Sequence, residues 1–224
     1  MARRTRVKIC GITRLQDAQL AQKLGADSLG FVFVPASTRF IEPASARGIV
    51  SELSPFVTCV GLFLNASADD VRVVLEMMPG LLPQFHGQET ADFCDQFQRP
   101  YLKALGLGQD QGDDSGGQMP DSRLLAEYRY ASGFLFDSNE PGQLGGTGHA
   151  FDWGRLGGNI DKPLILAGGL NVHNVGRAIK DVAPHAVDVS SGVESSKGIK
   201  DAELLRAFMS AVSKADLARK AVSA

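Results

Sequence analysis

The sequence predicts an α/β fold, a single closed (β/α)8 barrel, from three observations. Eight short apolar runs recur along the chain, and most of them are followed by a segment with helical periodicity. Such an alternation of strands and helices implies a parallel sheet. Dividing 224 residues by eight units gives 28 residues per unit, close to the roughly 30 of a strand–helix–strand repeat. A count of eight strands favours closure into a barrel.

The strands are expected, in chain order, at residues 6–10, 28–34, 57–63, 81–86, 101–105, 133–137, 163–167 and 186–190. The fourth run contains Pro83, which has no N–H for a ladder hydrogen bond. We therefore expect this strand to start at Gln84 or to carry a bulge.

The helices are expected at residues 15–24, 44–53, 68–78, 90–97, 122–130, 172–182 and 202–212. Several have a capping residue before them: Thr13, Ser67, Asp121 and Asn171. Two segments break the pattern. Residues 106–120 are polar and glycine-rich, which predicts a flexible loop that is either a lid or a solvated insertion, and residues 213–224 continue a helix or fray.

Composition limits the class of protein. With 44% hydrophobic residues and a formal net charge of -2, the chain fits one soluble domain over residues 1–224 with no affinity for nucleic acid. The cysteines at 10, 59 and 94 are odd in number and scattered, so no disulfide framework or paired zinc motif is expected, and the cytoplasm is the natural compartment. The basic start lacks the long apolar core of a secretory signal, and no stretch approaches a membrane span.

Polar residues and glycines stand where several strands end, which is where barrel enzymes place their active sites. In chain order these positions are Cys10, residues 35–39, Asn65, His86, Asp137, Gly168–Gly169 and Ser190–Gly192.

Cys10 ends the first strand and shares its face with Lys8. A thiolate is a capable base, but an unperturbed thiol with a pKa of roughly 8.5 is mostly protonated at neutral pH. We expect the ammonium of Lys8 to favour the thiolate. The alternative is a small core cysteine.

Asp137 ends the otherwise apolar sixth strand, where burial would allow the carboxyl group to donate a proton. The alternative is an aspartate that caps a turn. If Asp137 and Cys10 face the same small molecule, they form a plausible acid and base pair.

Two turns after the last strands predict a phosphate site. Gly168 and Gly169 follow the seventh strand, and Ser190, Ser191 and Gly192 follow the eighth. Bare backbone N–H groups and a helix N-terminus in these two loops bind an anion without needing lysine.

Other positions are ambiguous on residue type alone. Arg39 can grip a carboxylate bidentately or lie on the surface. His86 can contact a ligand or be structural, and the glycines of residues 145–148 can approach a ligand or only turn the chain.

Taken together, the motifs resemble the phosphoribosylanthranilate isomerase family, in order from about residue 6 to residue 208. The segments that carry the resemblance are 8–13, 31–33 with 37–39, 60–65, 84–87, 136–138, 145–148 with 151–153, 166–170 and 188–194.

The resemblance implies an Amadori rearrangement of N-(5-phosphoribosyl)anthranilate in tryptophan biosynthesis, with Asp137 as general acid and Cys10 as general base. It implies that Arg39 holds the anthranilate carboxylate, and that His86 and Asp188 contact the substrate. No cofactor or metal is implied, and the expected partner is a small phosphorylated substrate, with the chain a monomer or homodimer.

Three other functions remain open at this point. A sister sugar isomerase of histidine synthesis performs the same rearrangement, but that family resembles a barrel with aspartate where this chain has Cys10. A carbon–carbon lyase on a phosphate-binding barrel would need a different set of strand-end acids. A non-catalytic barrel that only binds phosphorylated metabolites would have no need of Cys10 and Asp137.

Overall fold

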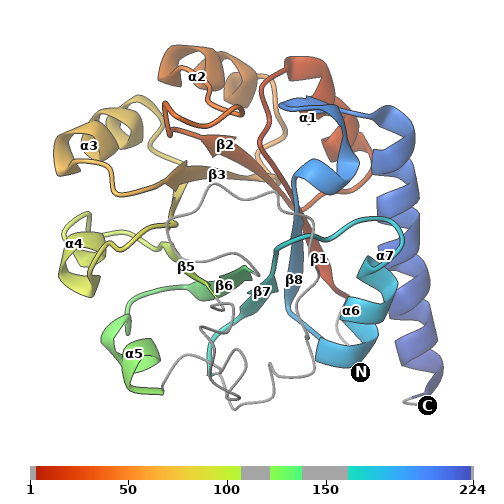
Figure 1. The fold of residues 1–224 in the computed structure, drawn as a ribbon. Helices are drawn as coiled ribbons and strands as arrows, with labels where there is room; N and C mark the ends of the chain where they lie inside the picture. The colour runs from red at the N-terminus through yellow and green to blue at the C-terminus, as the bar shows by residue number, and fades with distance from the viewer. Residues whose placement is uncertain (1–3, 107–121, 138–160, 223–224) are drawn as a thin grey trace.

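The computed structural model describes residues 4–106, 122–137 and 161–222. Eight parallel strands form a closed barrel in which each strand pairs with the next and the last pairs with the first (Figure 1). They are β1 (Arg6–Cys10), β2 (Ser28–Val32), β3 (Thr58–Phe63), β4 (Leu82–Phe85), β5 (Leu102–Gly106), β6 (Gly133–Asp137), β7 (Leu164–Leu166) and β8 (Ala186–Val189). The predicted barrel is confirmed, and every predicted strand overlaps an observed one.

The helices surround the barrel, as Figure 1 shows. They are α1 (Leu15–Lys23), α2 (Pro43–Ser51), α3 (Ala68–Met77), α4 (Ala91–Asp95), α5 (Ser122–Glu127), α6 (Val175–Val182) and α7 (Ala202–Val222). Residues 213–222 continue α7 and do not fray. Among the helices described, none is long and apolar enough to cross a membrane.

The predicted caps are only partly right. Ser67 caps α3 by accepting a hydrogen bond from the Asp70 N–H at 3.1 Å. Thr13 does not cap α1, because its hydroxyl donates to the Gly198 carbonyl at 2.5 Å. Asn171 lies in a turn before α6, where its N–H donates to the side chain of Asn174, so the helix begins later than predicted. Asp121 lies outside the described residues.

The expectation that β4 avoids Pro83 is wrong. Pro83 lies within the strand, opposite Gly61 of β3. The His86 N–H donates to β3, so alternation along the strand turns the nitrogen of Pro83 toward β5. Pairing with β5 begins only at Gln84, and the missing N–H therefore costs no ladder bond.

Inside and outside faces of the barrel alternate along each strand. Seven buried apolar residues form a cluster within the barrel: Val60, Leu102, Ala104, Leu135, Ile165, Ala167 and Ala186. The intervening residues, such as Ile9, Phe31 and Phe134, belong to the larger core beneath the helices.

The inner face of β1 is polar. Its register with β8 places Lys8 opposite Asp188, and their side chains form a buried ion pair of 2.9 Å. On β2, a Cβ at Gly30 would lie 2.8 Å from the sulfur of Cys10. Glycine at this position therefore leaves the space that the thiol occupies.

A short hairpin after β8 was not predicted. A 3₁₀ turn (Ser191–Val193) leads into β9 (Glu194–Ser196) and β10 (Ile199–Lys200), which pair antiparallel. The backbone N–H of Lys200 donates to Asp17 of α1 at 3.0 Å. The hairpin is thereby fixed to the first strand–helix unit.

Contacts between the two ends of the chain fix α7 against the segment that precedes β1. The backbone N–H and the hydroxyl of Thr5 donate to the carboxylate of Asp216 on α7, at 2.8 and 2.7 Å. Both groups are buried, and 211 positions separate them in the chain.

Lys103→Met should lower the free energy of unfolding by about 3–5 kcal/mol, because it leaves a buried carboxylate without its cation. Lys103 and Glu89 form an ion pair of 2.9 Å, each 2% exposed. Urea unfolding measures the change, and Arg206→Met, in an exposed pair with Glu203, is the matched control and should cost less than about 1 kcal/mol. Equal losses in the two variants would contradict this account of the buried pair.

Candidate functional site

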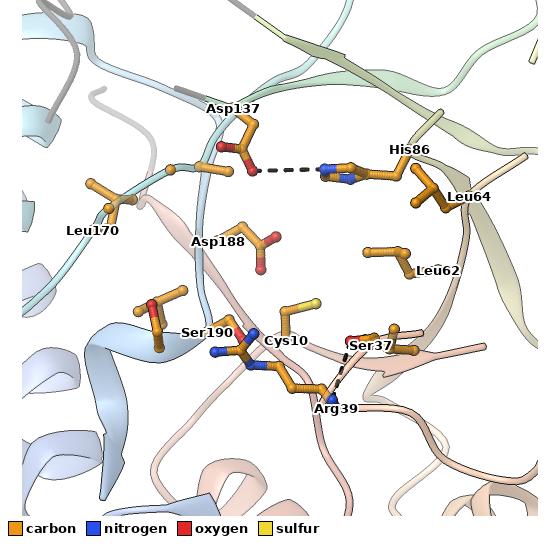
Figure 2. Close-up of a pocket in the computed structure, with 16 residues that line it drawn as sticks. Cys10, Ser37, Arg39, Leu62, Leu64, His86, Asp137, Leu170, Asp188 and Ser190 are labelled. Atoms are coloured by element: carbon orange, nitrogen blue, oxygen red, sulfur yellow. Dashed lines mark hydrogen bonds and ion pairs between the residues drawn. The ribbon is translucent and has the colours of Figure 1, made fainter. Parts of the chain in front are cut away.

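One cavity opens at the carboxyl ends of the strands, and the predicted site residues meet there (Figure 2). The cavity is lined by Cys10, Val32, Ser37, Arg39, Leu62, Leu64, His86, Asp137, Ala167, Gly168, Gly169, Leu170, Asp188, Val189, Ser190 and Ser191. Of the residues given a catalytic, substrate or phosphate role, Gly192 is not part of this lining. Asn65 and, from the stretch 35–39, Pro35, Ala36 and Thr38 also lie outside it. Closure of the barrel brings strand ends that are distant in sequence to one rim.

Cys10 is the last residue of β1 and is 6% exposed. Burial raises the pKa of the thiol, while the positive charges of Lys8 and Lys200 lower it and the carboxylate of Asp188 raises it. Lys8 thus acts in the predicted direction, but burial outweighs it. The pKa of Cys10 therefore lies above the ordinary value although two cations are nearby.

Asp137, at the end of β6, faces His86 across the rim. The His86 Nε2 atom lies 3.7 Å from the Asp137 carboxylate, and its Nδ1 atom lies 3.0 Å from the amide nitrogen of Gln84. Because that amide can only donate, Nδ1 is the acceptor and Nε2 carries the proton. Burial lowers the pKa of His86 although Asp137 opposes the shift, so a neutral N–H points at the carboxylate.

The two predicted anion-binding turns are built as tight turns. Gly168 and Gly169 have φ values of +81° and +63°, a region that residues with a side chain seldom adopt. A Cβ at Gly192 would lie 2.0 Å from the carbonyl oxygen of Leu170, so this glycine lets the two turns approach each other. The hydroxyl of Ser190 is buried and has no hydrogen-bond partner among the described residues.

Asp188 lies between Asp137 and Cys10 in the view of Figure 2. One of its oxygens accepts from Lys8, and the other is buried without a hydrogen-bond partner in the part of the chain that the structure describes. An unsatisfied carboxylate oxygen in a cavity is suited to a hydroxyl or amine donor.

Arg39 follows β2 and lines the cavity, but the structure adds a partner that sequence reasoning missed. Its Nε and Nη2 atoms donate to the two carboxylate oxygens of Glu194, both at 2.8 Å. Lys200 donates to the same carboxylate at 2.8 Å. For the hairpin the sequence offered one signal, Gly198, which indicates a turn that places Lys200 opposite Glu194.

An apolar wall was also missed. Val32, Leu62 and Leu64 pack with Cys10 and face the cavity. The inward alternation of the third apolar run is the signal that identifies Leu62 and Leu64. This wall gives the cavity a surface for a flat apolar group.

No group of three or more histidine, cysteine, aspartate or glutamate side chains is placed to hold a metal ion within residues 4–106, 122–137 and 161–222. The glycines of 145–148, the motif at 151–153 and the loop beyond Gly106 lie outside the described residues.

Comparison with known proteins identifies close relatives over nearly the whole chain. A family model described as N-(5'phosphoribosyl)anthranilate (PRA) isomerase matches residues 7–211. The N-(5'-phosphoribosyl)anthranilate isomerase of Hahella chejuensis is 48% identical over 210 residues, which cover 94% of this chain and 95% of the relative. A Pseudomonas putida protein of the same name is 50% identical, with 94% and 98% covered.

Solved structures agree with this family. The phosphoribosyl anthranilate isomerase of Thermotoga maritima superposes with a TM-score of 0.81 at 38% identity, covering 94% of this chain and 99% of that one. A phosphoribosyl anthranilate isomerase in complex with reduced 1-(o-carboxyphenylamino)-1-deoxyribulose 5-phosphate gives 0.78 at 37% identity, with 94% and 99% covered. A further structure, of monomers generated from the dimeric T. maritima enzyme, gives 0.76 at 36%, again with 94% and 99% covered.

Alkylation of the native protein over a pH series should give Cys10 a pKa above the roughly 8.5 of an unperturbed thiol. Lys8→Met should raise it further, because burial is then less opposed and Asp188 is left unpaired. Peptide mass spectrometry separates Cys10 from Cys59 and Cys94, whose pKa values burial raises to about 11 and about 12. The control is Lys214→Met on the surface of α7, which should leave the Cys10 pKa unchanged. If Lys8→Met also leaves it unchanged, Lys8 does not influence the ionisation of Cys10.

Proposed function

The chain belongs to the N-(5'-phosphoribosyl)anthranilate isomerase family, and from this premise we propose how its cavity carries out the Amadori rearrangement. The substrate is N-(5-phosphoribosyl)anthranilate, the product is 1-(2-carboxyphenylamino)-1-deoxyribulose 5-phosphate, and the step belongs to tryptophan biosynthesis. The observation that carries the mechanism is one cavity in which a carboxyl group and a thiol both line the space beside the turn at Gly168 and Gly169.

Binding is assigned to groups that are already in place. The phosphate is held by backbone N–H groups at Gly168, Gly169 and Ser191 and by the buried hydroxyl of Ser190. The aromatic ring lies on the apolar wall, and its carboxylate meets Arg39. Holding the substrate at both ends fixes the ribose carbons between acid and base.

Two proton transfers follow. Asp137 in its acid form donates a proton to the furanose ring oxygen as the anilino nitrogen pushes the C1–O bond open, which yields an iminium ion. Cys10 as thiolate then removes the proton from C2, and the electron pair of the C–H bond neutralises the iminium to give an enolamine. The enolamine tautomerises to the ketone.

His86 and Asp188 act beside this pair. The neutral Nε2–H of His86 points at Asp137 and stabilises the carboxylate that forms when the acid has given up its proton. The unpartnered oxygen of Asp188 accepts from a substrate hydroxyl or amine. Cys10 must ionise before it can act, and the positive charges of Lys8 and Lys200 lower the cost of that ionisation.

Family membership excludes the histidine-pathway isomerase and the carbon–carbon lyase as the primary function. The non-catalytic alternative is tested directly by activity. We further infer a cytoplasmic enzyme that needs no nucleic acid, membrane, cofactor or metal and that works as a monomer or homodimer. The solution mass measured by light scattering decides between the two states.

Cys10→Ser and Asp137→Asn should each lower kcat by about 100- to 10,000-fold, the usual contribution of a general acid or base. Turnover is followed by the loss of anthranilate-ester fluorescence on freshly prepared substrate. Cys59→Ser, beneath the helices, and Asp181→Asn, on α6, are matched controls outside the cavity. Full activity in either site variant would contradict its assigned role, and an inactive wild type that still binds substrate would favour the non-catalytic barrel.

Ser190→Ala should raise KM about 10- to 100-fold, because a hydrogen bond to a charged group is lost. Inhibition by inorganic phosphate should weaken by a similar factor, which ties the effect to the phosphate and not to the aromatic end. Ser210→Ala on the exposed side of α7 is the control. Unchanged phosphate inhibition in the Ser190 variant would remove this hydroxyl from the phosphate site.

A further inference from the structure

The hairpin of β9 and β10 carries a buried charge cluster next to the cavity, which we define as Arg39, Glu194 and Lys200. The side chains of Glu194 and Lys200 are 5% and 0% exposed, and that of Arg39 is 15% exposed. The register of the hairpin places Lys200 directly opposite Glu194. Of the three residues, only Arg39 lines the cavity.

Glu194 holds the guanidinium of Arg39 along one edge. Both carboxylate oxygens of Glu194 are occupied, one by Nε and the other by Nη2, at 2.8 Å each. Among the described residues nothing accepts a hydrogen bond from Nη1. The edge formed by Nη1 and the second N–H of Nη2 therefore remains available for another planar carboxylate.

The cluster is also unbalanced in charge. With Lys200 protonated, two cations face one anion, Glu194, which gives a net charge of +1 in a nearly closed space. Burial lowers the pKa of Lys200, and the charge of Glu194 opposes that shift. Burial disfavours the charge of Glu194, yet the hydrogen bonds and charges of Arg39 and Lys200 hold its pKa below the ordinary value. One further carboxylate on Arg39 would bring the cluster to neutrality.

The geometry of Glu194 is held from outside the cluster. The Lys200 ammonium also donates to the Ser190 carbonyl at 3.1 Å, and the Lys200 backbone N–H donates to Asp17. A Cβ at Gly11 would lie 2.5 Å from the Cδ atom of Arg39, so the stem of the arginine passes directly over the backbone of the first loop. Arg39 is thus confined on two sides.

We propose that Glu194, supported by Lys200, is a positioning residue that turns Arg39 toward the carboxylate of the substrate and makes the enzyme select phosphoribosylated aromatic amines that carry this carboxylate. The inference rests on the proposed function. A substrate without the carboxylate leaves the available edge of Arg39 desolvated and the excess charge uncompensated, which disfavours its binding.

The test compares wild type and variant on two substrates, one with and one without the carboxylate. N-(5-phosphoribosyl)anthranilate and N-(5-phosphoribosyl)aniline, prepared from ribose 5-phosphate and the two amines, differ only in the carboxylate, and chromatography measures both products. Glu194→Gln should lower kcat/KM for the anthranilate about 10- to 100-fold, mainly through KM, and change kcat/KM for the aniline less than about threefold. Glu203→Gln, an exposed glutamate at the start of α7, is the matched control.

A second variant separates loss of positioning from loss of folding. Glu194→Gln leaves the buried ammonium of Lys200 uncompensated, whereas Glu194→Gln with Lys200→Met removes both charges, a replacement that proteins often tolerate. Lys200→Met also removes a cation that favours the Cys10 thiolate, so the double variant should lose kcat on both substrates to the same extent. On top of this shared loss, KM should rise only for the carboxylated substrate.

Equal losses of kcat/KM on both substrates in the double variant, or no loss on either, would overturn the proposal and leave Glu194 a structural residue. These outcomes are read against a wild type that turns over the anthranilate substrate. A wild type without this activity would instead refute the proposed function, so the two failures are distinct.

Discussion

Closure of the barrel between β1 and β8 is the contact on which the site depends. The register of these strands sets Lys8 opposite Asp188, and each charge persists in the interior only because the other lies 2.9 Å away. The next inward position on β1 is Cys10, and it fits because β2 has Gly30 beside it. A slip of one residue would turn the thiol toward the helices and the lysine into the outer core. Only this register places both the ion pair and the thiol inside the barrel.

The cavity separates groups that stay neutral from groups that keep their charge. Burial raises the pKa of Cys10 and lowers that of His86, which favours their neutral forms. Pairing holds the pKa of Arg39 above and that of Glu194 below the ordinary value. In the proposed mechanism Cys10 must first lose its proton, and it can do so without breaking an ion pair. In the proposed function the charged groups serve binding and orientation, where a fixed field is more useful than a titrating one. Acid–base chemistry and recognition are thus assigned to different residues of one rim.

The sequence predicts the barrel well because period-two apolar runs and their helical intervals are local patterns. Cys10, Asp137 and the glycine turns were identified for the same reason: each stands at the end of a local run. What could not be predicted depends on contacts across the fold. Whether Pro83 breaks β4 depends on where β5 begins to pair, and the start of α6 depends on a turn closed by side chains. Glu194, the partner of Arg39, lies 155 positions away on a hairpin of two very short strands. No periodic sequence pattern predicts such a pairing.

The hydrogen bonds between Thr5 and Asp216 have a consequence for how the chain is made. A ribosome delivers β1 first and α7 last, so Lys8 emerges long before the carboxylate of Asp188 that neutralises it. A growing chain holds this lysine and Cys10 on an unpaired strand edge, accessible to water and to other chains. The ion pair can form only after β8 has been made, and the hydrogen bonds of Thr5 with Asp216 only after most of α7 has been made. Most of the chain must therefore be synthesised before the buried charge of its first strand can find its partner.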